Sequence, residues 1–154
     1  MTSGLRSRSN TKVLGGSSDG VLLKRELALC AHPAELAIAR RFFDAAAADF
    51  GLDERRRHQV TMAANEAVSN ALRHGAPFSG GVIYLGATAE HDELVCSVHD
   101  GGSFELLGSA DPDPWAEPGR GFPLMSLLVD EVALETGSEG TVVRLSKRRG
   151  TSPI

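Results

Sequence analysis

Three polar side chains recur at four-residue intervals in the alanine-rich stretch VTMAANEAVSNALRHG, residues 60–75. They are Glu66, Asn70 and His74. In a helix each step of four advances by only about 40°, so the three form a slanted polar row beside the apolar face. A carboxylate and a carboxamide one turn apart suit a hydrated divalent cation, because the amide oxygen can ligate Mg²⁺ while the carboxylate accepts a proton from a nucleophile. A solvated helix flank fits the same spacing, so this helix alone leaves both interpretations open.

A second polar group closes the β-prone run ELVCSVHD, just before two glycines. Cys96, Val98 and Asp100 share one parity of a strand, so Asp100 is expected to project toward the same side as two apolar residues. A carboxylate at the edge of an apolar pocket needs a hydrogen-bond donor. The exocyclic amine of an adenine is one such donor. An aspartate that forms a turn before glycine is the alternative that this motif leaves open.

A third motif, PGRGFPLM, places Gly119 and Gly121 before a predicted helix start. Glycines let the backbone approach a ligand closely, and the N–H groups at a helix N-terminus favour an anionic phosphate. The segment before these glycines is not a strand and Leu124 stands at the third glycine position, which argues against a Rossmann fingerprint. The GxxxxGK[ST] pattern of a P-loop is also missing from the sequence.

Hydrophobic periodicity predicts the elements that must position these groups. A helix is expected from Pro33 to Phe50, ended by Gly51, and a second helix is capped by Asp53 and ends at Gly75 and Pro77. The remaining elements are an edge strand over 21–30, an antiparallel pair over 81–90 and 93–100, a long loop over 101–121, a short helix over 122–130 and a closing hairpin of 131–136 with 141–147. This order predicts an α/β fold, a two-layer sandwich of a mainly antiparallel sheet with helices on one face.

Length and charge restrict the class of protein. The 154 residues suit one domain, and a net charge of −4 gives no general electrostatic reason to bind nucleic acid or an anionic membrane. Apolar runs are too short to span a membrane and the N-terminus lacks a signal pattern, so a cytoplasmic protein is expected. Cys30 and Cys96 lack metal-site spacing and are interpreted as buried thiols. The domain is expected to cover 21–148, with a flexible N-terminal tail at 1–20 and a C-terminal tail at 149–154.

Taken together, NEAVSNALRHG, VHDGGSF, GRGFPLMSLLVDEV and GTVVRL resemble the N-box, the two glycine boxes and the last strand of a Bergerat-type (GHKL) ATPase. In detail they resemble the anti-sigma factor serine/threonine kinases of the RsbW and SpoIIAB type. The resemblance covers roughly residues 21 to 148.

The resemblance implies a role for each site residue. Glu66 would be the general base and Asn70 the ligand of the Mg²⁺ that bridges the ATP phosphates. Asp100 would accept the adenine amine. The full nucleotide-binding set implied is Asn70, His74, Asp100, Gly102, Gly119, Arg120, Gly121, Phe122 and Thr141.

Such proteins phosphorylate a serine or threonine of a small STAS-domain antagonist and sequester a sigma factor, and a homodimer is possible by the same resemblance. This chain reads DGGSF where the family usually reads DxGxGF or DxGxPF, one residue shorter. The departure motivates an alternative from another class, a non-catalytic protein that sequesters a sigma factor or other regulator with nucleotide structural or absent.

Overall fold

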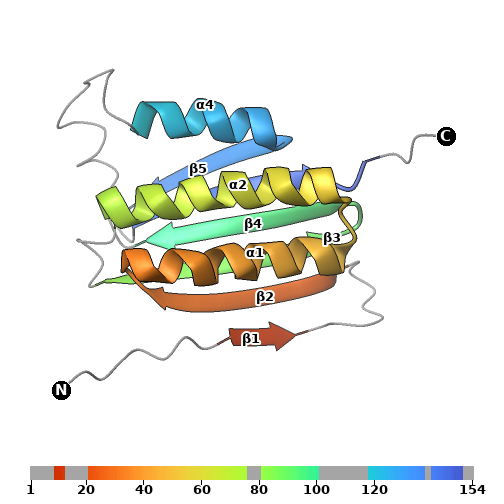
Figure 1. Ribbon diagram of the computed structural model, residues 1–154, viewed down its shortest axis with the longest axis horizontal. Coiled ribbons are helices and arrows are strands. Elements are labelled where there is room, and N and C mark those ends of the chain that lie inside the picture. The colour runs from red at the N-terminus through yellow and green to blue at the C-terminus, as the bar shows by residue number, and fades with distance from the viewer. Residues whose placement is uncertain (1–8, 13–20, 76–80, 101–117, 138–139, 151–154) are drawn as a thin grey trace.

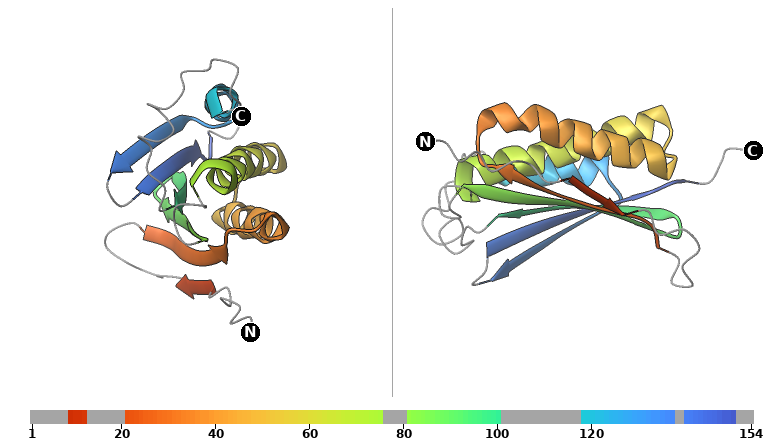
Figure 2. Two further views of the ribbon diagram at one scale, coloured as in Figure 1. Left: turned by 90° about the vertical axis from the view of Figure 1, so that its left-hand side faces the viewer. Right: turned by 90° about the horizontal axis from the view of Figure 1, so that it is seen from below.

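The computed structural model describes residues 9–12, 21–75, 81–100, 118–137 and 140–150. Two layers make up this part of the chain: a twisted sheet, and helices on one of its faces (Figures 1 and 2). The elements are β1 (Ser9–Lys12), β2 (Val21–Cys30), η1 (Pro33–Glu35), α1 (Leu36–Phe50), α2 (Glu54–Asn70), η2 (Ala71–Gly75), β3 (Val82–Glu90), β4 (Glu93–Asp100), α4 (Pro118–Leu128), β5 (Glu131–Gly137) and β6 (Gly140–Arg148).

The six strands lie in the order β1-β2-β3-β4-β6-β5, and each neighbouring pair is antiparallel. The predicted α/β sandwich is therefore confirmed, with an antiparallel sheet. The prediction that 21–30 is an edge strand is wrong, because β1 pairs with β2 on its outer side. The prediction of a tail over 1–20 also missed β1. Its sequence SNTK has no apolar residue that would indicate a strand.

The two long helices follow the predicted periodicity. Gly51 ends α1 in the left-handed region at φ 94°, which glycine adopts without a steric penalty. The Asp53 side chain accepts a hydrogen bond from the backbone N–H of Arg56 and so caps α2. Beyond Asn70 the chain stays helical, but η2 is a π-helix rather than a continuation of the α-helix.

The core lies between the sheet and α1 with α2. Small side chains on α2, Ala63, Ala64 and Ala67, are fully buried and let this helix lie close to the strands. Larger apolar side chains fill the remaining space; they are Leu27, Leu29, Phe43, Ile83, Leu85, Leu94, Val98, Met125 and Leu145. None of the helices in the described ranges is long and apolar enough to cross a membrane.

The start of α4 and the start of the C-terminal tail both differ from the sequence prediction. The helix α4 begins at Pro118, so Gly119 and Gly121 lie inside its first turns rather than before it. Proline suits a first helical position because its missing N–H would have no helical partner there. The predicted C-terminal tail does not begin at 149, since the N–H of Arg149 donates to the carbonyl of Asp92.

Candidate functional site

Several of the predicted site residues lie at one end of the sandwich. Helix α2 with η2 runs toward this end, β4 finishes there, and α4 and β6 start there (Figure 1). Both α2 and η2 also pack against β4. The antiparallel pairing of β4 with β6 brings the end of β4 beside the start of β6, and α2 also packs against α4.

Asp100 and Thr141 form the sheet side of this end. They are direct partners in the register of β4 and β6, and their exposed fractions are 7% and 5%. The predicted parity is confirmed, because Cys96, Val98 and Asp100 are all buried on the face that the helices cover. A carboxylate and a hydroxyl therefore end two neighbouring rows of apolar side chains, where a planar polar ligand such as a nucleobase can be recognised.

Glu66 and Asn70 form the helix side. Both are half-buried at the margin of the apolar face of α2, as the four-residue spacing predicts. The Asn70 Oδ1 accepts a hydrogen bond of 2.6 Å from an Nη2 of Arg73, and the same nitrogen lies 3.5 Å from Glu66 Oε1. The side chain of Glu66 is 25% exposed. Its carboxylate is thus held by a cation while it stays accessible at the rim.

Arg73 is the residue that the sequence interpretation missed. The predicted polar row consists of residues four positions apart, whereas Arg73 follows Asn70 by three residues and Glu66 by seven. Both spacings return to nearly the same side of a helix, and helical side chains lean toward the N-terminus. The spacing therefore indicates that the long side chain of Arg73 can reach both Asn70 and Glu66.

The other predicted binding residues lie on two helical segments. His74 lies in η2, and Gly119, Arg120, Gly121 and Phe122 lie in the first turns of α4. Gly102 lies outside the described residues, as do the other residues of 101–117.

A metal site built from the side chains of β4 is not formed. His99 lies on the open face of the sheet, where its ring is 6.0 Å from that of Tyr84, while Cys96 and Asp100 are buried on the opposite face. Across the described residues no group of three or more His, Cys, Asp or Glu side chains could hold a metal ion. Asn70 with Glu66 nearby fits a magnesium ion that takes most of its ligands from phosphates and water, the usual arrangement for Mg²⁺.

Cys30 and Cys96 are not joined by a disulfide. Burial raises the pKa of Cys96 to about 12, so this thiol is unreactive at neutral pH. Cys30 is only half-buried.

A family model described as the histidine kinase-like ATPase domain matches residues 29–147. The chain belongs to this family. An anti-sigma F factor from Clostridium acetobutylicum is 34% identical over 58% of this chain and 68% of its own length. A solved structure of the RsbU and RsbW domains of a Mycobacterium tuberculosis protein has a TM-score of 0.56 at 20% identity. That match covers 80% of this chain but only 32% of the other, and it supports the fold. The resemblance to the RsbW and SpoIIAB type of GHKL protein is confirmed.

Proposed function

We propose that this protein is an ATP-dependent serine/threonine kinase and anti-sigma factor. It phosphorylates a STAS-domain antagonist, and it sequesters a sigma factor when that antagonist is not available. The observation that carries the proposal is the arrangement at one end of the sandwich, where α2 and η2 pack against β4 and the end of β4 pairs with the start of β6. Membership of the histidine kinase-like ATPase family and the similarity to an anti-sigma F factor support it. The proposal includes a cytoplasmic location and a possible homodimer.

The nucleotide would bind with its adenine against Asp100 and Thr141. The buried carboxylate would accept the exocyclic amine, and the hydroxyl would offer a second polar contact to the base. Such a charge-assisted hydrogen bond contributes about 1.5 to 3 kcal/mol. The backbone of the first turns of α4, at Gly119 and Gly121, would face the phosphates, which helix N-termini attract.

Asn70 and Glu66 would serve the phosphate end. Asn70 Oδ1 would hold a magnesium ion, which when bound neutralises and aligns the phosphates. Glu66 would accept the proton of the substrate hydroxyl while that oxygen bonds to the terminal phosphorus of ATP and the bond from this phosphorus to the bridging oxygen breaks, so that ADP leaves. Phosphoryl transfer requires mainly positioning and charge stabilisation, so a base, an amide ligand and backbone donors can suffice.

The kinase proposal is tested by transfer of radiolabelled phosphate from ATP to a cognate STAS-domain protein. Glu66→Gln is expected to slow transfer by roughly 10² to 10⁴, the usual contribution of a general base, and to leave Mg-ATP binding intact. Glu54→Gln is a matched control, because Glu54 is exposed in the first turn of the same helix at the opposite end. Unchanged transfer in Glu66→Gln would remove the base from the mechanism.

The alternative, a non-catalytic sequestering protein, rests on the shortened DGGSF motif. Calorimetry of the wild-type chain with millimolar Mg-ATP separates the two. A stable complex with a sigma factor in the absence of any nucleotide binding would favour the alternative and reject the kinase.

A further inference from the structure

A single guanidinium contacts both groups that the proposed function places at the phosphates. The Nη2 of Arg73 donates to Asn70 Oδ1 at 2.6 Å and lies 3.5 Å from Glu66 Oε1. The first distance is slightly shorter than the usual range of about 2.7 to 3.2 Å for a hydrogen bond between nitrogen and oxygen, and a charged donor shortens such bonds. Arg73 therefore occupies the same two oxygens that a magnesium ion and a substrate hydroxyl would need.

Arg73 and a magnesium ion compete for the same oxygen of Asn70. A carboxamide offers only its oxygen to a metal, because its nitrogen carries two hydrogens and acts as a donor. With Arg73 in contact, that oxygen already faces a positive charge. A guanidinium and a divalent cation a few ångströms apart repel each other, so a metal ion at Asn70 requires Arg73 to move away.

Arg73 is placed so that it can move. Its side chain is 40% exposed, so the ion pair with Glu66 is screened by water and the guanidinium can be rehydrated when it leaves. Its backbone lies in η2, the π-helical turn that ends α2, and turns of this kind occur frequently at functional sites.

We propose that Arg73 is a placeholder cation. In the nucleotide-free protein it positions Asn70 and Glu66 by bridging their oxygens, and it leaves Asn70 when magnesium and nucleotide bind. Arg73 thus acts as a positioning residue that lowers the apparent affinity for the magnesium complex. The proposal rests on the proposed function, since it needs a magnesium nucleotide at Asn70.

The test is calorimetric titration of the full chain with ADP, with magnesium and with EDTA. Arg73→Met keeps the aliphatic length and removes the charge and the donor. It is expected to bind Mg-ADP roughly three- to tenfold more tightly than wild type, with metal-free ADP bound no more tightly. Arg55→Met, which removes an exposed arginine from the other end of α2, is the matched control and should not strengthen Mg-ADP binding.

A double-mutant cycle locates the effect. In an Asn70→Ala background, Arg73→Met should no longer strengthen Mg-ADP binding, because the oxygen for which the two cations compete is gone. Arg73→Lys, which keeps the charge, serves as a second variant, and thermal unfolding checks that each protein is folded.

The outcomes separate the inference from the function beneath it. Equal or weaker Mg-ADP binding by folded Arg73→Met, with clear binding by wild type, would overturn the placeholder role and leave the proposed nucleotide site standing. Weaker binding would indicate instead that Arg73 contacts the phosphates. If wild type binds no nucleotide with magnesium, both the proposed function and this inference fail.

Discussion

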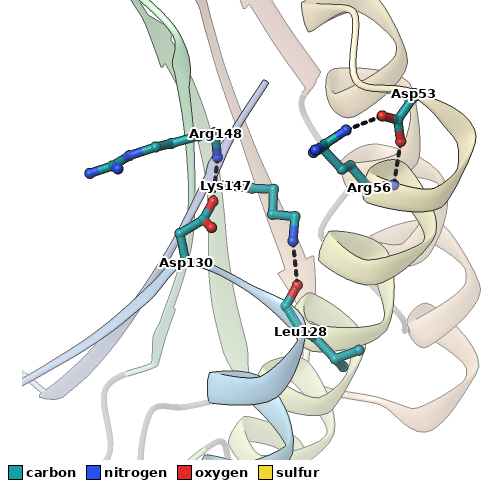
Figure 3. Close-up of polar contacts among 6 residues, drawn as sticks. All are labelled: Asp53, Arg56, Leu128, Asp130, Lys147 and Arg148. Atoms are coloured by element: carbon teal, nitrogen blue, oxygen red, sulfur yellow. Dashed lines mark hydrogen bonds and ion pairs between the residues drawn. The ribbon is translucent and has the colours of Figure 1, made fainter. Parts of the chain in front are cut away.

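The two ends of the sandwich use their polar side chains in opposite ways. At the end opposite the candidate site, charged side chains cap the helices (Figure 3). The Nζ of Lys147 donates to the carbonyl of Leu128 at the end of α4 at 2.8 Å. Arg149 donates to the carbonyl of Phe50 at the end of α1 at 2.8 Å, and its guanidinium lies 4.2 Å from the centre of the Phe50 ring. Asp53 caps α2.

On the helix side of the site end, the polar groups instead bind each other along one helical segment. Glu66 and Asn70 are held by an arginine that comes from the same helical segment. Contacts between distant elements stabilise the fold, whereas contacts along one helix can be exchanged for a ligand at little cost to the fold. The first end, the fastening end, therefore attaches α4 to β6 through Lys147 and α1 to the residue after β6 through Arg149. The second end presents groups that the proposed ligand can displace.

The largest effect is expected from Asp100 at the site end. Asp100→Asn keeps the shape of the side chain but replaces the charged acceptor by an amide. Because a charge-assisted bond to the adenine amine would be lost, the Kd for Mg-ATP should rise roughly 10- to 100-fold, as measured by calorimetry.

Thr141→Val, which removes the hydroxyl of the partner residue in the register, should have a smaller effect in the same direction. Binding that is unchanged in both variants would show that the buried polar pair serves the fold rather than a ligand. It would also remove the distinction between the two ends.

The next prediction concerns the contacts of Arg149 with Phe50 at the fastening end. Arg149→Ala removes the hydrogen bond to the last carbonyl of α1 and the contact with the Phe50 ring, so the free energy of unfolding should fall by about 1 to 2 kcal/mol. Urea denaturation measures this change. Arg148→Ala is the matched control, because the bond of Arg148 to Asp130 uses its backbone N–H and survives the substitution.

Nucleotide affinity should stay at the wild-type level in Arg149→Ala. A loss of affinity as large as that of Asp100→Asn would mean that the two ends are coupled and that the fastening end also shapes the site.

Much of the fold could be predicted from the sequence because the strongest patterns are local. The apolar steps in α1, the alternation in β3 and β4 and the cap at Asp53 each need only neighbouring residues. The strand β1 could not be found in this way, since four polar residues carry no alternation and pair only because β2 presents an edge. The start of α4 was misplaced because glycine and proline suggest a loop, although proline is favoured in a first helical turn.

The candidate site was only partly predictable for a related reason. Spacing along α2 predicted the row of Glu66 and Asn70, and parity predicted the buried side chain of Asp100. The pairing of Asp100 with Thr141 depends on β4 lying beside β6 rather than beside β5, a non-local neighbour relation that strand patterns do not specify. The resemblance to a family placed Thr141 at the site, and the register explains how it reaches there.

The smallest effect concerns the pH dependence at the fastening end. Desolvation by burial lowers the pKa of Lys147, with the nearby Asp130 opposing this shift. Between the lowered pKa of the folded state and the ordinary value of 10.5, the unfolded chain binds more protons at this group than the folded one. Its contribution to stability should therefore rise with pH across that window and stay constant below it, because there the lysine is protonated in both states.

The contribution of Lys147 is isolated by difference. Urea denaturation at several pH values up to about 10 gives the free energy of unfolding of wild type and of Lys147→Met. As pH rises, the free energy of unfolding of wild type should increase relative to that of Lys147→Met. Lys24→Met, which alters an exposed lysine of β2, is the control, and its difference in unfolding free energy from wild type should not change with pH. If the difference in unfolding free energy between wild type and Lys147→Met were also independent of pH, the ammonium of Lys147 would not be desolvated. The bond to Leu128 would then be an ordinary surface contact, and the attachment of helices at this end would depend on Arg149 instead.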